Sequence, residues 1–224
     1  MSELLIVACT RSKTIEEFET RPLYRSLMHH FEERYDVNFH LFKDNTRGLA
    51  TCYNEILRDP ENLNKTVLFV HDDVELEDTF LVDKLLASPY SITGLAGAKS
   101  FNKRSQKLAW HISAPKEDYV GEVAHNHDGK VWTTVFGPTK SRALVIDGLF
   151  IACKVKDLVK KDLYFDEEFD FHFYDIAFCL RANDKKVTCG VLPIRVVHHG
   201  IGDSMLTPQW EEANIKFGNT YCKQ

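Results

Sequence analysis

The sequence predicts an α/β protein: a single domain built on a mostly parallel sheet with helices on both faces, joined to a smaller antiparallel or mixed sheet. Its 224 residues, 44% of them hydrophobic, are enough for one large domain of this kind. Over residues 1–98, apolar strand-like segments alternate with amphipathic helical segments, which is the pattern of parallel strands joined by helices. Beyond residue 98, short apolar segments are separated by polar loops, which favours antiparallel or mixed pairing.

The first half of the chain is expected to contain three strands, each followed by a helix. The first helix begins near Pro22 and repeats apolar side chains at every fourth residue as far as Tyr35. Asn45 is expected to cap the second helix. The strands are predicted at residues 4–9, 37–42 and 66–70, and the helices at 22–35, 46–58 and 78–87.

From residue 92 onward, strands predominate in the prediction. The tetrapeptide Asn126-His127-Asp128-Gly129 is a hairpin turn signal. Residues 205–224 are interpreted as a C-terminal tail. Strands are predicted at 92–98, 108–112, 131–136, 143–153 and 187–197, and helices at 154–161 and 172–182.

Composition and charge exclude several classes of function. The net charge of −5 and the isoelectric point near 6.1 give no overall basic surface for nucleic acid, and they leave room for a local basic cleft. No apolar run approaches the roughly 20 residues of a membrane span, and the N-terminus lacks the charged region of a signal peptide. The six cysteines contain no Cys-x-x-Cys, and no glycine-rich phosphate loop occurs. A cytoplasmic protein with reduced thiols is therefore expected.

The central strand at residues 66–70 runs directly into His71, Asp72 and Asp73. In open α/β sheets, ligands bind at the carboxyl ends of the strands. Adjacent carboxylates repel one another unless a cation or hydrogen-bond donors balance them. A divalent ion shared with phosphate oxygens would provide that balance. The alternative is that the two aspartates only end the strand and open a solvated turn.

Six short segments occur in a fixed order along the chain. They are Asn45-Thr46-Arg47-Gly48-Leu49-Ala50 with Asn54, then His71-Asp72-Asp73, Asp147-Gly148, Phe165-Asp166-Glu167, Tyr174-Asp175-Ile176-Ala177-Phe178-Cys179-Leu180-Arg181 and His198-His199-Gly200. In this order they resemble the motifs of the GT-A glycosyltransferases, which have a Rossmann-like fold, and within them the family 2 type and its smaller relatives. The resemblance implies one GT-A domain over residues 1–224, with a nucleotide-binding half at about 1–98 and an acceptor and catalytic half at about 99–204.

The resemblance implies a metal-dependent transferase that uses a nucleotide-sugar donor, with a UDP-sugar favoured. Asp73 would bind the metal and Asp72 the ribose, although His71 replaces the first aspartate of the family's Asp-x-Asp motif. His198 or His199 would supply an imidazole ligand, and His198 is preferred because alternate residues of a strand face opposite sides. Imidazole favours Mn²⁺ over Mg²⁺. The remaining expected donor contacts are Thr10, Arg11, Asp44, Asn45, Arg47, Asp147 and Gly148.

The same resemblance makes Asp175 the general base that takes the proton of an acceptor hydroxyl, on a glycan or another molecule. A single base suits an inverting displacement. Tyr174 stands where the family usually has Glu, and Ala177 where it has a second Asp. An acceptor sugar could stack on the aromatic segment at residues 99–142, which includes Trp110, His111 and Trp132; these side chains could equally pack the second sheet.

Two alternatives stay open from the sequence. His71, Asp73 and His198 match the two-histidine, one-carboxylate set of non-haem iron oxygenases, although alternating strands and helices do not suit the barrels of those enzymes. The substitutions at Tyr174 and Ala177 also allow a noncatalytic module that binds nucleotide sugars. If Asp175 is not the base, Asp147 or Asp170 are the other acidic candidates.

Overall fold

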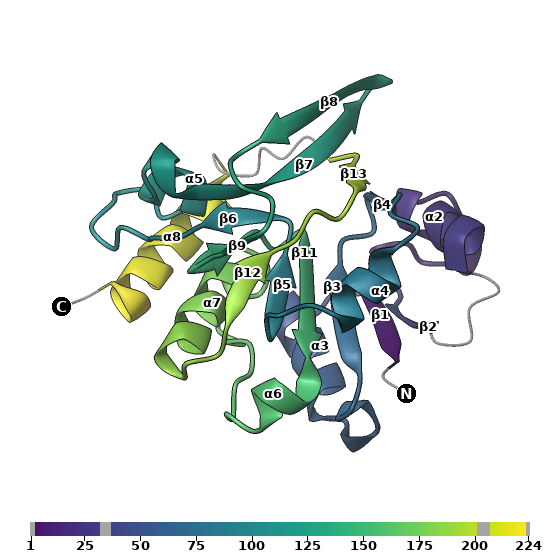
Figure 1. Ribbon diagram of the computed structural model, residues 1–224, viewed down its shortest axis with the longest axis horizontal. Helices are drawn as coiled ribbons and strands as arrows, with labels where there is room; N and C mark the ends of the chain where they lie inside the picture. Colours follow the sequence, from purple (N-terminus) through teal and green to yellow (C-terminus); the bar gives the residue numbers. More distant parts are fainter. Residues whose placement is uncertain (1–2, 32–36, 201–206, 223–224) are drawn as a thin grey trace.

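The computed structural model describes residues 3–31, 37–200 and 207–222, and it confirms the predicted fold class (Figure 1). The larger sheet has seven strands in the order β2-β1-β3-β11-β5-β12-β9. Five of them run in one direction, while β11 and β9 run in the other. The strands are β1 (Leu4–Cys9), β2 (Val37–Phe42), β3 (Thr66–Val70), β5 (Ile92–Gly94), β9 (Ser141–Arg142), β11 (Phe150–Lys154) and β12 (Cys189–Val191).

The smaller sheet is mixed, as expected, and has the order β10-β6-β7-β13-β4, with β8 paired to β7. The β7–β8 hairpin projects from the top of the molecule in Figure 1. Its turn has positive φ angles at Asp128 and Gly129, which confirms the hairpin turn predicted there. The strands are β4 (Val74–Leu76), β6 (Ala96–Ala98), β7 (Tyr119–His127), β8 (Lys130–Val135), β10 (Val145–Ile146) and β13 (Val196–His198).

Helices connect and flank these strands. The first predicted helix ends at Phe31 in the structure, and Tyr35 lies outside the described residues. The α-helices are α1 (Ile15–Glu19), α2 (Pro22–Phe31), α3 (Leu49–Arg58), α4 (Leu81–Leu86), α5 (Trp110–Ser113), α6 (Val155–Val159), α7 (Tyr174–Asp184) and α8 (Pro208–Tyr221), with 3₁₀ turns η1 (Pro60–Asn62) and η2 (Lys116–Asp118). In the described part of the chain, no helix combines the length and the apolar character needed to cross a bilayer.

The central strand β3 is buried along its whole length. Since alternate side chains of a strand point to opposite faces, both faces of the sheet must be covered there. Tyr53 of α3 stacks on Phe69 with ring centroids 4.2 Å apart, so α3 covers one of these faces. This packing fixes the carboxyl end of β3, where the two aspartates follow.

Four details of the prediction are wrong. Residues 108–112 are not a strand, because the backbone N–H groups of Ile112 and Ser113 bond to the Ala109 carbonyl and form α5. The long strands predicted at 92–98, 143–153 and 187–197 each divide and pass from one sheet to the other. Asn45 does not cap α3, which begins after Gly48. The expected tail contains α8.

One buried side chain joins α3 to the segment that leads into α7. Asn54 is fully buried, and its amide donates to the Phe165 carbonyl at 3.0 Å and accepts from the Phe165 N–H at 2.8 Å. It also donates to Glu167 Oε1 at 2.8 Å. Asn54 therefore satisfies backbone groups that water does not reach.

We expect Asn54→Ala to lower the free energy of unfolding by about 2–4 kcal/mol, because it leaves both Phe165 backbone groups without partners. Urea unfolding followed by circular dichroism measures this. Asn64→Ala, at an exposed position outside this network, is the control and should change stability by less than about 0.5 kcal/mol. Equal effects of the two substitutions would contradict the role given to Asn54.

Candidate functional site

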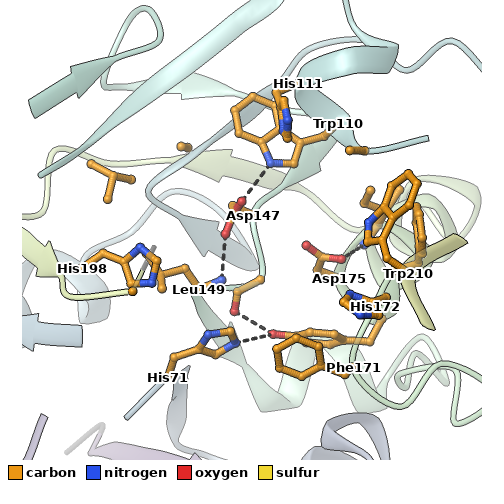
Figure 2. Close-up of a pocket in the computed structure, with 18 of the residues that line it drawn as sticks. His71, Trp110, His111, Asp147, Leu149, Phe171, His172, Asp175, His198 and Trp210 are labelled. Carbon is orange, nitrogen blue, oxygen red and sulfur yellow. Dashed lines mark hydrogen bonds between the residues drawn. The ribbon is translucent and has the colours of Figure 1, made fainter. Parts of the chain in front are cut away.

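A pocket with a volume of about 580 Å³ lies where the two sheets meet (Figure 2). Its lining comes from segments far apart in the sequence: the turn after β3, α5, β7, the loop between β10 and β11, the start of α7, the end of β13 and α8. The titratable side chains among these are His71, Asp73, His111, His125, Asp147, His172, Tyr174, Asp175 and His198. Acids and imidazoles thus dominate the polar lining.

Asp73 and His198 face each other in this pocket. The pairing of β13 with β4 sets His198 opposite Val74, so its ring lies beside Asp73, with His198 Nε2 3.4 Å from Asp73 Oδ2. Burial alone would raise the pKa of Asp73, but the hydrogen bond with His198 and the charges of His71 and His198 lower it below its ordinary value. The other oxygen, Asp73 Oδ1, is buried and has no hydrogen-bond partner among the described residues.

His199 points elsewhere. Its Nε2 lies 3.0 Å from Glu75 Oε2, while its backbone N–H donates to the Asp73 carbonyl. Two of the three expected metal ligands therefore lie together, and the third lies apart. Within the described ranges, no group of three or more histidine, cysteine or acidic side chains has the geometry of a metal site.

Asp72 turns away from this pocket and is held by two donors. Arg21 binds it through two nitrogens, with Nε 2.9 Å from Oδ2 and Nη2 3.1 Å from Oδ1. The Thr10 hydroxyl donates to the same Oδ2 at 2.6 Å. The expected ribose contact is thus a carboxylate already fixed by an arginine that the sequence analysis missed, since Arg21 precedes an ordinary helix start and carries no motif.

The other expected donor residues divide into two groups. Asp147 and Gly148 line the pocket. Thr10 lies beside Asp72, and its carbonyl accepts from the Asn45 N–H at 2.9 Å. Arg11, Asp44 and Arg47 are exposed; Arg47 pairs with Glu55 at 2.8 Å and stacks over Phe42. This second group borders the carboxyl ends of β1 and β2.

Tyr174 fills the position where the family usually has Glu. Its hydroxyl donates to the Gly148 carbonyl at 2.8 Å, so His71 Nε2, 3.2 Å away, must act as donor to the tyrosine oxygen. Burial lowers the pKa of His71 below its ordinary value, and the contact with Tyr174 requires a proton on Nε2. Gly148 permits this contact, because a Cβ there would lie 2.5 Å from the Tyr174 oxygen.

Asp175, the first-turn acid of α7, faces the same cavity as Asp147 (Figure 2). Burial, helped by the negative charge of Asp147, raises the pKa of Asp175 to about 7. Its Oδ1 accepts from the Ile176 N–H at 2.8 Å. Asp147 itself is oriented by the Trp110 indole N–H at 2.9 Å and the Leu149 N–H at 3.0 Å.

The aromatic segment at 99–142 has two roles in the structure. Trp110 is buried and positions Asp147, whereas Trp132 on β8 is 43% exposed and stacks on His125. The pocket also contains side chains that the sequence analysis missed. His125 belongs to the unexpected strand β7, Trp210 to the unexpected helix α8, and Phe171 and His172 to the turn before α7. Of these four residues, only Phe171 and His172 could have been found from the sequence, because they lie next to the motif that begins α7.

The structure thus defines an α/β protein with a pocket of acids and imidazoles where its two sheets meet, and comparison with known families gives the particular family. The model of a glycosyltransferase-like family matches residues 15–221, so the chain belongs to that family. It is thereby a member of the transferase class, and a sugar donor and an acceptor are implied.

Two further comparisons add little. A putative glucose-1-phosphate thymidylyltransferase from Bacillus anthracis, solved in complex with a sucrose, is 11% identical, with 89% of this chain and 87% of that chain covered and a TM-score of 0.33. A likeness at that level carries no argument about function. The comparison with curated proteins gave no match.

The raised pKa of Asp175 has a consequence for stability. Between its ordinary value of 3.8 and about 7, the folded protein retains a proton that the unfolded chain releases. The stability contributed by this group is therefore full below pH 3.8 and is lost as the pH rises through about 7.

We expect Asp175→Asn, which cannot ionise, to gain stability relative to the wild type when the pH is raised from about 4 to about 8. Urea unfolding at both pH values measures the difference. Asp162→Asn removes an exposed carboxylate and is the control. A stability difference between Asp175→Asn and the wild type that does not change with pH would contradict the assignment.

Proposed function

We propose that this protein is a metal-dependent glycosyltransferase that moves a sugar from a nucleotide-sugar donor, a UDP-sugar first, to a hydroxyl acceptor with inversion. One observation carries the proposal. A buried carboxyl with a pKa of about 7, Asp175, shares a pocket with the Asp73–His198 pair at the end of the central strand. Family membership supplies the reaction class, and these side chains supply the chemistry.

The residues present fit a divalent ion. Asp73 Oδ1 is buried without a partner, and a carboxylate beside an imidazole is a donor set that suits Mn²⁺. Among the described residues of the lining, none is a lysine or an arginine, so a diphosphate would need another source of positive charge. When bound, the ion would stabilise the charge that develops on the leaving diphosphate. Asp73 and His198 would hold it, with phosphate oxygens and water completing its coordination.

Asp175 is proposed as the general base. A base works best when its pKa lies near the working pH, and a value of about 7 meets that condition. The carboxylate would take the proton of the acceptor hydroxyl as that oxygen attacks the anomeric carbon from the face opposite the leaving group. Asp147 is less suited, because both of its oxygens already accept hydrogen bonds. Asp170 lies against Gly48 at the start of α3 and is not part of the lining.

The acceptor is proposed to lie on the aromatic side of the pocket. Phe171, His172 and Trp210 line the cavity with Asp175 (Figure 2). The faces of aromatic rings suit the apolar faces of sugars. An acceptor held there would have a hydroxyl within reach of the proposed base.

The oxygenase alternative has weaker support. His71 uses Nε2 to donate to Tyr174, so it does not complete a three-ligand set with Asp73 and His198. A noncatalytic nucleotide-sugar-binding module differs from the proposed enzyme only in turnover.

We expect UDP-sugars to raise the melting temperature in the presence of Mn²⁺ but not in the presence of chelator, since selective binding stabilises the folded state. A thermal-shift screen of UDP-, GDP- and dTDP-sugars measures this. Asp73→Ala and His198→Ala should abolish the metal-dependent shift. His199→Ala should retain it, because His199 faces Glu75. Equal stabilisation in chelator would remove the metal from the proposal.

We expect Asp175→Asn to keep the metal-dependent shift while transfer to the acceptor falls about 10²- to 10⁴-fold, the usual loss for a general base. The substitution preserves size but removes the proton acceptor. Product formation at saturating donor measures it, with Asp170→Asn as the matched control that should retain turnover. Wild-type turnover in Asp175→Asn would exclude this residue as the base; no turnover in the wild type with any acceptor would favour the binding module.

A further inference from the structure

A second pocket, with a volume of about 530 Å³, lies at the other end of α7. Its walls include Ser141–Arg142, the edge strand β9, together with β12 and the last turns of α7. This volume is within the usual range for small-molecule sites.

The rim of this pocket is cationic. Lys99, Arg142 and Lys186 line it, and among the described residues that do so none is acidic. All three are exposed, and none forms a salt bridge with a described residue. Three like charges around one cavity attract an anion, and arginine in particular binds phosphate through two parallel hydrogen bonds.

The floor is apolar. The buried side chains of Cys179, Val187 and Cys189 close the pocket, and the thiols of Cys179 and Cys189 contact each other. An apolar floor beneath a charged rim suits a molecule that joins an organic body to an anionic group, with the rim binding the anionic group.

This pocket is distinct from the one that contains the proposed base. Asp175, Cys179 and Asn183 follow one another at intervals of four on α7, so they lie along one face of the helix. Asp175 lines the first pocket and the other two line the second. No described residue lines both pockets.

We propose that this second pocket binds a small molecule carrying a phosphate or diphosphate group. The inference stands apart from the proposed transferase activity, because it rests on a different set of side chains. Two sources share this chemistry, a soluble phosphorylated compound and a lipid headgroup, and the closed, apolar floor favours the soluble compound.

The test is calorimetric titration with inorganic pyrophosphate in chelator, using the full chain carrying Asp73→Ala so that the first pocket is disabled. We expect saturable binding of one equivalent. Adding both Arg142→Gln and Lys186→Gln to this chain should lower its affinity for pyrophosphate about tenfold or more. Adding Lys130→Gln and Lys160→Gln, which remove the same charge from exposed positions outside both pockets, should leave it within about twofold.

Three results would overturn the proposal. One is the absence of saturable binding, and another is equal weakening by the two charge-matched pairs, which would indicate nonspecific attraction. The third is binding to phosphatidylglycerol vesicles that depends on Arg142 and Lys186 without any saturable pyrophosphate binding, which would assign the surface to lipid headgroups. Circular dichroism of each variant establishes that it is folded, and the metal-dependent donor shift of the chain with Asp73 intact tests the transferase proposal separately.

Discussion

The different surroundings of two adjacent carboxylates determine how the proposed catalytic pocket is built. Asp72 and Asp73 follow the same buried strand, and two uncompensated charges there would oppose folding. The fold separates them: Arg21 and Thr10 neutralise Asp72 on one side, while Asp73 faces His198 on the other. Because Asp72 is compensated from outside the pocket, Asp73 keeps one buried oxygen without a partner. That oxygen is the strongest structural argument for a cation in the pocket.

On the opposite wall of the pocket, the burial of one acidic side chain near another also opposes folding. Asp175 is buried near Asp147, and both effects oppose its ionisation. Tyr174 replaces the acid that the family usually carries beside it, and its hydroxyl bridges His71 and the Gly148 carbonyl. A second acid at that position would add another negative charge next to Asp175. The tyrosine instead gives a hydrogen-bonded support that adds no negative charge beside Asp175, the proposed base.

The sequence predicted the parts of the fold that depend on local pattern. The alternation of buried strands and amphipathic helices gave β1, β2, β3 and α3 nearly to the residue, and the Asn126–Gly129 signal gave the hairpin turn. The prediction from sequence failed where the chain passes from one sheet to the other, as between β5 and β6. An apolar run does not indicate which strand it pairs with. In the pocket, motif residues such as Asp73 and His198 came together through strand pairing. The positions of Arg21, His125 and Trp210 could not be predicted. Tertiary contacts bring these side chains to the site, and no sequence motif connects them with Asp73 or Asp175.

The net charge of the chain does not indicate where its charged side chains lie in the structure. An overall value of −5 indicates no overall basic surface but leaves room for a local one, and the described residues line two pockets of opposite character at the two ends of α7. Among the described residues, the lining of the first pocket has aspartates and histidines but no lysine or arginine, which supports the proposal that an anionic donor binds there together with a cation. Among the described residues, the lining of the second pocket has three cations and no acid. Under the two proposals made above, donor binding to the first pocket therefore requires a metal ion, whereas anion binding to the second does not.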